Sequence, residues 1–240
     1  MTNFARAWED QRVHSRWLIA VVIASCAAAH ASEPAFTCIA HRGGIVRGVP
    51  ENTLAAVRNA LALGAHGVEL DVRASADGAL VAMHDDKVQR TTNGRGLVAR
   101  LTLAQLRALD AGGGERVPTF AEAVAQIARE RRLLLADVKT RDVPLRELLR
   151  VAHEGGAAHA LIFGLRDLDS LREARALAPR PRTLGFPERA RDAEPFARAG
   201  AAIVRVEPAW LRRDAALAQR VRALGAEAWA LTGSAPPEEI

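Results

Sequence analysis

The chain has 240 residues, of which 49% are hydrophobic and 25% are charged, and its formal net charge is +5. This length suits one globular domain with a sizeable core, and the hydrophobic content excludes an intrinsically disordered chain. The basic residues are scattered singly or in pairs, without a basic stripe interleaved with aromatic residues. We therefore expect no binding to nucleic acid.

The first part of the chain has the pattern of an export signal. Basic residues up to Arg16 precede an apolar stretch over residues 17–29, and Ala-His-Ala at residues 29–31 is a small-x-small cleavage pattern. The apolar stretch is short for a transmembrane helix. We predict a signal peptide over residues 1–31 and a mature domain over residues 32–240, located in the periplasm or secreted.

A lipoprotein is the alternative. The sequence Ile-Ala-Ser-Cys ending at Cys26 resembles a lipoprotein box, in which Cys26 would become the lipidated first residue and anchor the chain to a membrane. Cys38 is the only other cysteine, so the mature chain is not expected to contain an internal disulfide.

Downstream of this segment, apolar β-prone runs alternate with amphipathic helical stretches, which predicts parallel βα units. The predicted strands cover residues 36–40, 67–72, 133–138, 160–164, 182–186, 201–206 and 227–232. The helices predicted between them cover residues 53–63, 118–130, 144–153, 168–177, 190–199 and 214–224.

Residues 73–116 interrupt this alternation. Residues 73–84 are predicted to form a hairpin, because Asp77-Gly78 supplies its turn, and a hairpin joins antiparallel strands rather than consecutive barrel strands. A short helix over residues 102–109 follows within a glycine-rich loop. We interpret residues 73–116 as an insertion after the second barrel strand.

The expected fold class is α/β, a TIM-type (β/α)8 barrel that lacks its C-terminal eighth strand. Seven barrel strands are predicted, whereas this barrel has eight. Residues 236–240 have an early proline and acidic residues, which are typical of the first turn of a helix. We therefore expect a truncated C-terminus, and an open arrangement of seven strands is the alternative.

Carboxylates occur at the ends of two predicted strands. Glu69 and Asp71 are two residues apart, so both side chains point to one side of the strand, while Leu70 faces the packing. Two adjacent carboxylates repel each other unless a cation lies between them. Asp137 closes the next apolar strand, at the end where barrel active sites lie. Because hard oxygen ligands favour Mg²⁺ or Ca²⁺, we predict one divalent cation here; surface acids paired with arginine are the alternative.

Basic side chains occur at the same strand ends. His41 follows the first strand and precedes Arg42, and His84 ends a further strand. Histidine can transfer protons near neutral pH, and arginine fits a phosphate with two hydrogen bonds. Lys139, one of only two lysines, follows Asp137 and would provide a compact positive charge. These residues together indicate metal-assisted phosphate-ester chemistry.

With Pro-Glu-Asn-Thr at residues 50–53, these motifs resemble the glycerophosphodiester phosphodiesterase family of the PI-PLC-like phosphodiesterase superfamily. The likeness runs from about residue 36 to the C-terminus and is densest over residues 41–92. The resemblance implies a metal site with the ligands Glu69, Asp71 and Asp137. The family has glutamate where this chain has Asp137, which is one methylene shorter, so a lower metal affinity is expected.

The resemblance also implies roles for the other residues. His41 would be the general base and His84 the general acid, Arg42 and Lys139 would bind the phosphoryl oxygens, and Glu51 would contact the substrate hydroxyls. The implied reaction is metal-dependent hydrolysis of small glycerophosphodiesters, such as glycerophosphocholine, to glycerol 3-phosphate and an alcohol. Two alternatives stay open: a lysophospholipid or sphingolipid phosphodiesterase, which needs an apolar slot for acyl chains, and a catalytically inactive truncated fragment.

Overall fold

The computed structural model describes residues 17–20 and 36–231, in which eight parallel strands form a closed barrel. The ring runs through β2, β3, β5, β6, β7, β8, β9 and β1 and closes where β1 pairs with both β9 and β2. The strands are β1 (Trp17–Ala20), β2 (Phe36–Ala40), β3 (Gly67–Ala74), β5 (Leu133–Val138), β6 (Leu161–Leu165), β7 (Arg182–Gly185), β8 (Ile203–Val206) and β9 (Glu227–Leu231). This arrangement confirms the predicted TIM-type fold, and the seven predicted strands are each placed within two residues of their bounds.

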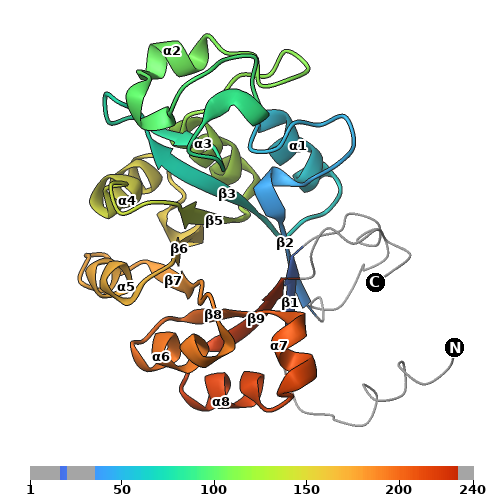
Figure 1. Ribbon diagram of the computed structural model, residues 1–240, viewed down its shortest axis with the longest axis vertical. Helices are drawn as coiled ribbons and strands as arrows, with labels where there is room; N and C mark the ends of the chain where they lie inside the picture. Colours follow the sequence, from blue (N-terminus) through green and yellow to red (C-terminus); the bar gives the residue numbers. More distant parts are fainter. Residues whose placement is uncertain (1–16, 21–35, 232–240) are drawn as a thin grey trace, which may run out of the picture.

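Helices surround the strands on the outside (Figure 1). They are α1 (Leu54–Ala62), α3 (Phe120–Glu130), α4 (Leu145–Glu154), α5 (Leu168–Arg175), α6 (Ala193–Arg198), α7 (Pro208–Arg213) and α8 (Leu217–Ala223). The sequence did not lead us to predict α7, although Pro208 stands at its first position, where proline is favoured. None of the helices in the described part of the chain has the length and apolar character needed to cross a bilayer.

The insertion begins with the predicted hairpin. The last residues of β3 pair antiparallel with β4 (Leu80–Ala82), and α2 (Leu103–Arg107) follows. Thr102 caps α2 and forms a reciprocal capping box with Gln105, which explains why so short a helix begins there. A small apolar cluster lies in the insertion and the residue that follows it, made by Val81, Met83, Val88, Val98, Leu106 and Val117.

The eighth position of the barrel is taken by β1. A C-terminal eighth strand is not found among the described residues, and β1 lies between β9 and β2, parallel to both. Residues 17–20 belong to the predicted signal peptide, of which residues 1–16 and 21–31 lie outside the described residues. Export therefore stays a prediction, and cleavage after Ala31 would remove β1 and leave edges of β2 and β9 unpaired.

The core has two main layers because the side chains of a strand alternate between its two faces. Leu70 of β3 and Leu134 of β5 face outward and pack against the helices. Ile39, Leu135 and Ile162 face inward with residues of the later strands and fill the barrel interior. The inner layer forms the floor beneath the strand ends, where the polar residues gather.

Replacing Leu70 with alanine should lower the free energy of unfolding by about 2–5 kcal/mol, because the change removes fully buried methyl groups and leaves a cavity. Leu63→Ala is the matched control: this leucine is 44% exposed, and its loss should cost less than about 1 kcal/mol. Urea unfolding curves of both variants measure the difference. Equal losses would contradict the assignment of Leu70 to the core.

Candidate active site

The three carboxylates predicted as metal ligands come together at the C-terminal ends of β3 and β5. The two strands pair in parallel with Asp71 opposite Asp137, and Glu69 is one alternation earlier on the same face of β3. All three residues are buried, and each offers an oxygen within 4.8 Å of the oxygens of the other two. The strand register therefore places the negative charges side by side, as the sequence predicts.

Lys139 lies between two of these acids. Its Nζ is 2.6 Å from Asp71 Oδ1 and 2.5 Å from Asp137 Oδ2. Burial opposes ionisation of Asp71, but Lys139 and Asn52 outweigh it and lower the pKa of Asp71. Burial and the two neighbouring aspartates raise the pKa of Glu69 well above its usual range.

The acidic cluster fits a divalent cation. Asp137 Oδ1 is buried and accepts no hydrogen bond from the residues that the structure describes. A buried carboxylate oxygen without a donor is costly, and a hard cation would satisfy it. Three carboxylates of this kind are the oxygen donor set expected for Mg²⁺ or Ca²⁺.

Asn52 fixes the position of Asp71, a role that the sequence analysis missed. Its Nδ2 donates to Asp71 Oδ2 at 2.6 Å, and its Oδ1 accepts from the Asp71 backbone N–H at 3.0 Å. The left-handed backbone of Asn52 (φ 56°) turns the amide toward β3, and asparagine tolerates this conformation. The helix cap is Thr53, whose hydroxyl accepts from the Ala56 N–H.

His41 and Arg42 lie on a single 3₁₀ turn (His41–Gly43) that directly follows β2. The Arg42 backbone N–H donates to Glu69 Oε2 at 2.7 Å, and Arg42 has a left-handed backbone (φ 53°). His41 Nε2 is 3.9 Å from the same oxygen. Burial, and then the charge of Arg42, lower the pKa of His41 to about 4. The ring is therefore neutral at neutral pH.

A chain of ion pairs links Arg42 to His84. Arg42 Nη1 is 3.1 Å from Glu51 Oε1, which also accepts from Arg90 Nη2 at 2.7 Å. Arg90 Nε contacts Asp85 Oδ2 at 2.6 Å, and Asp85 Oδ1 lies 2.7 Å from His84 Nδ1. These hydrogen bonds, that of Arg90 first, hold the pKa of Asp85 far below its usual range. Asp85 thus occupies Nδ1 of His84 and leaves Nε2 for other contacts.

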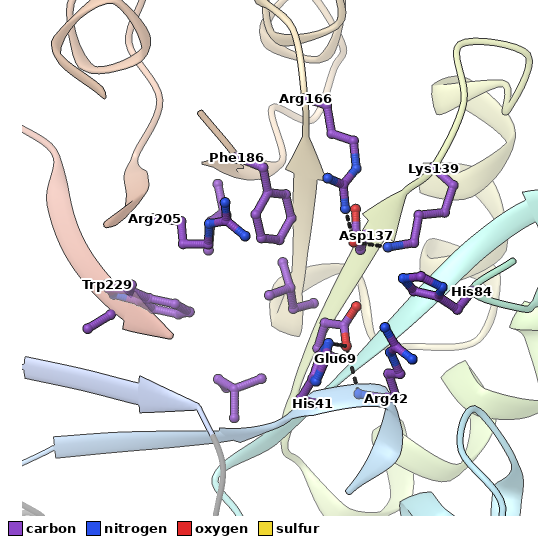
Figure 2. A pocket seen from close by; sticks show the side chains of 14 residues that line it. His41, Arg42, Glu69, His84, Asp137, Lys139, Arg166, Phe186, Arg205 and Trp229 are labelled. Atoms are coloured by element: carbon purple, nitrogen blue, oxygen red, sulfur yellow. Dashed lines mark hydrogen bonds and ion pairs between the residues drawn. The ribbon is translucent and has the colours of Figure 1, made fainter. Parts of the chain in front are cut away.

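A cavity of about 320 Å³ lies over these groups (Figure 2). Six of the eight residues predicted for the site line it, namely His41, Arg42, Glu69, His84, Asp137 and Lys139. Asp71 is fully buried beneath the wall, and Glu51 lies outside the cavity, where it joins two arginines. Its predicted contact with substrate hydroxyls stays a prediction.

The rest of the cavity wall carries four residues that the sequence analysis did not single out: Arg166, Phe186, Arg205 and Trp229. They come from the later half of the barrel, on or just after β6, β7, β8 and β9. Arg166 and Phe186 lie just beyond strand ends, where a barrel site is expected. That position was the only signal in the sequence, because none of the four belongs to a recognisable motif.

Comparison with known proteins identifies the family. The chain matches the glycerophosphoryl diester phosphodiesterase family over residues 41–226. The chain belongs to this family, as the motifs predicted. It is 39% identical over 152 residues to a glycerophosphodiester phosphodiesterase of Caldanaerobacter subterraneus, a match that covers 59% of this chain and 62% of that protein. Human glycerophosphodiester phosphodiesterase 1 is 41% identical over 128 residues, 49% of this chain and 38% of the human protein.

These matches span less than two thirds of either relative, but solved structures match more of the fold. A glycerophosphodiester phosphodiesterase of Agrobacterium tumefaciens superposes with a TM-score of 0.70 at 26% identity, covering 92% of this chain and 88% of that one. A phosphodiesterase of Oleispira antarctica, solved with the product sn-glycerol-3-phosphate, gives a TM-score of 0.71 at 30% identity, covering 82% and 84%.

Replacing Asn52 with glycine should weaken binding of Mg²⁺ or Ca²⁺ by about 10- to 100-fold, because Asp71 loses the group that orients it. Glycine adopts the left-handed backbone freely, so the change removes the amide without adding strain. Asn93→Gly, at an exposed asparagine of the insertion, is the control and should leave the affinity unchanged. Isothermal titration with each cation measures both variants. Wild-type affinity in Asn52→Gly would mean that this amide does not support a metal ligand.

Proposed function

We propose that this chain hydrolyses glycerophosphodiesters to glycerol 3-phosphate and an alcohol, with the help of one divalent cation. The observation that carries the proposal is the convergence of a buried acidic cluster, two histidines and two cationic side chains on one cavity. Membership of the family supports it, and so does the glycerol 3-phosphate product bound in the O. antarctica relative.

Glu69, Asp71 and Asp137 would hold the cation, which is Mg²⁺ or Ca²⁺ on the chemistry of its oxygen donors. When bound, such an ion neutralises negative charge on the phosphoryl group. Asn52 and the Arg42 backbone N–H orient two of these ligands from the protein side. The site is thus organised before the substrate arrives.

The substrate phosphoryl group would bind Arg42 and Lys139. Glu51 holds Nη1 of Arg42, while Nε of Arg42 is buried and lies 3.8 Å from Asp71 Oδ2. Arg42 lines the cavity, so its remaining terminal nitrogen, Nη2, would be the donor to a phosphoryl oxygen. Lys139 is already held between two acids, so its charge is fixed at the cavity wall and stabilises negative charge that develops during the reaction.

The two histidines would move the protons. His41 lies beside Glu69 at the cavity and accepts a proton from the nucleophile, which is either the neighbouring glycerol hydroxyl, giving a cyclic phosphate, or water. His84 is oriented through Nδ1 by Asp85 and would donate a proton from Nε2 to the departing alkoxide. One proton is thereby removed from the nucleophile and one is supplied to the leaving group.

The lipid phosphodiesterase alternative needs an apolar slot beside the site. Phe186 and Trp229 do supply apolar surface to the cavity wall, but Arg166 and Arg205 lie against Phe186 and bring charge to that surface. This arrangement favours a water-soluble substrate over one with an acyl chain.

The full-length protein should release glycerol 3-phosphate from glycerophosphoglycerol, whose alcohol is uncharged. EDTA should stop the release and Mg²⁺ or Ca²⁺ should restore it. Glu69→Ala should lower kcat/KM by at least about 100-fold because it removes a metal ligand. Glu130→Ala, at an exposed glutamate at the end of α3, is the control and should retain full activity. Release by folded Glu69→Ala at the wild-type rate would overturn the metal assignment.

Asp137→Glu restores the longer acid that the family uses at this position, and it should maintain or raise the affinity for the cation. The added methylene extends the carboxylate toward the oxygens of its neighbours, which already lie within 4.8 Å. Equilibrium dialysis against Mg²⁺ and Ca²⁺ measures the change. A large loss of affinity would show that the site is built around the shorter side chain.

A further inference from the structure

The cavity wall formed by the later strands contains an aromatic ring between two guanidinium groups, one of which contacts Asp137 of the acidic cluster. Phe186 directly follows β7, Arg166 directly follows β6, and Arg205 lies on β8. The Cζ atoms of Arg166 and Arg205 are 5.0 Å and 5.2 Å from the centre of the Phe186 ring. Figure 2 shows the ring between the two arginines, across the cavity from His84 and Arg42. We call these three residues the arginine–phenylalanine cluster.

The arginines of this cluster keep capacity for a further anion. Arg205 pairs with Glu207 Oε1 at 3.0 Å and donates to the Pro187 carbonyl, but its Nε is buried and makes no hydrogen bond with the described residues. Arg166 uses Nη2 to contact Asp137 Oδ2 at 2.5 Å and is 42% exposed at the cavity mouth. Each guanidinium has five N–H donors, so several donors remain at the cavity wall.

The charge of this wall selects against a cationic ligand. Of the described residues that line the cavity on this side, the charged ones are Arg166 and Arg205, of which Arg166 also contacts the lining residue Asp137, and the others are apolar. A quaternary ammonium group is usually bound by an open aromatic face. Here guanidinium groups already lie against the ring of Phe186. A choline group placed at this wall would therefore meet like charge.

The alcohol is the part of a glycerophosphodiester that can carry an additional charge and so pair with the arginines, because the glycerol carries only neutral hydroxyls. Figure 2 shows Arg166 and His84 on either side of Lys139. An alcohol that leaves from the side of His84 would pass Lys139 to reach Arg166, whose side chain is 42% exposed. An acidic group on that alcohol would accept hydrogen bonds from the guanidinium groups in a partly desolvated place, where they are strong.

We propose that the arginine–phenylalanine cluster is a subsite for an anionic group, and that the enzyme prefers glycerophosphodiesters whose alcohol carries a carboxylate or a phosphate. This inference rests on the proposed function and specifies its substrate class. The phosphodiester itself would bind at Arg42 and Lys139, so the acidic group recognised here is a second one.

The test compares kcat/KM for four diesters with the cation present. The glycerophosphodiester of glycolate carries a carboxylate, glycerophosphoinositol 4-phosphate a phosphate, glycerophosphoglycerol no charge and glycerophosphocholine a cation. We expect at least one acidic substrate to exceed glycerophosphocholine by about 10-fold or more, the size of a charged hydrogen bond, with the neutral diester between them. The two acidic substrates distinguish carboxylate from phosphate recognition.

Arg166→Gln and Arg205→Gln should each reduce the preference for the acidic diester over glycerophosphocholine by about 10-fold. The ratio is informative even if Arg166→Gln also disturbs Asp137, because weaker cation binding affects every substrate alike. Arg189→Gln removes the same charge from an exposed position outside the cavity and should leave the ratio unchanged. Equal rates for all four substrates, a preference for glycerophosphocholine, or an unchanged ratio in both variants would overturn the proposal.

Direct binding separates this inference from the proposed function. Titration of EDTA-treated wild-type protein with the glycerophosphodiester of glycolate, glycerophosphoinositol 4-phosphate and glycerophosphocholine reports the charge preference without turnover. Tighter binding of an acidic diester, lost in Arg205→Gln, would support the subsite even if no diester were hydrolysed. If none of the four diesters is hydrolysed with the cation present, the proposed function alone is overturned. If the diesters bind without a preference for negative charge, the subsite is overturned.

Discussion

The site depends on the burial of three carboxylates at the junction of β3 and β5. The parallel register puts Asp71 opposite Asp137, with Glu69 on the same face. Buried charges of like sign are strongly destabilising unless they are paired and hydrogen-bonded. Lys139, Asn52 and the backbone of Arg42 supply that compensation, and the last two do so from left-handed backbone conformations. The left-handed conformations in the loop after β2 therefore place hydrogen-bond donors beside the buried carboxylates.

The two halves of the barrel supply different groups of residues to the cavity. The early strands and the insertion supply the acidic cluster, both histidines, Arg42 and Lys139, whereas the later strands supply the arginine–phenylalanine cluster and Trp229. Arg90, in the insertion, joins Asp85 to Glu51 and so couples the orientation of His84 to that of Arg42. The insertion, which interrupts the regular βα pattern, thus contributes residues to the candidate site, as is common for loops above the strand ends of a barrel.

The apolar segment near the start of the chain shows a limit of sequence patterns. A short apolar run flanked by basic residues is typical of an export signal, but a buried barrel strand needs the same apolar character. Residues 17–20 pair with both β9 and β2, which makes them the eighth strand of the closed ring. The pattern does not predict this pairing because the neighbours that pair with the segment lie elsewhere in the sequence, and export of the chain stays a prediction.

By itself the sequence determined the alternation of strands and helices, the hairpin of the insertion and the positions of the chemical groups at strand ends, because periodicity and turn residues are local properties. It determined the pairing of Glu69 with Asp71 as well, since residues two apart on a strand share a face, whereas the register of β3 against β5 adds Asp137 to them. Only the tertiary structure decided that Asn52 holds Asp71, that Glu51 joins two arginines, and that Arg166 and Arg205 meet at Phe186. These contacts join segments that are distant in the chain, and closure of the barrel brings them together.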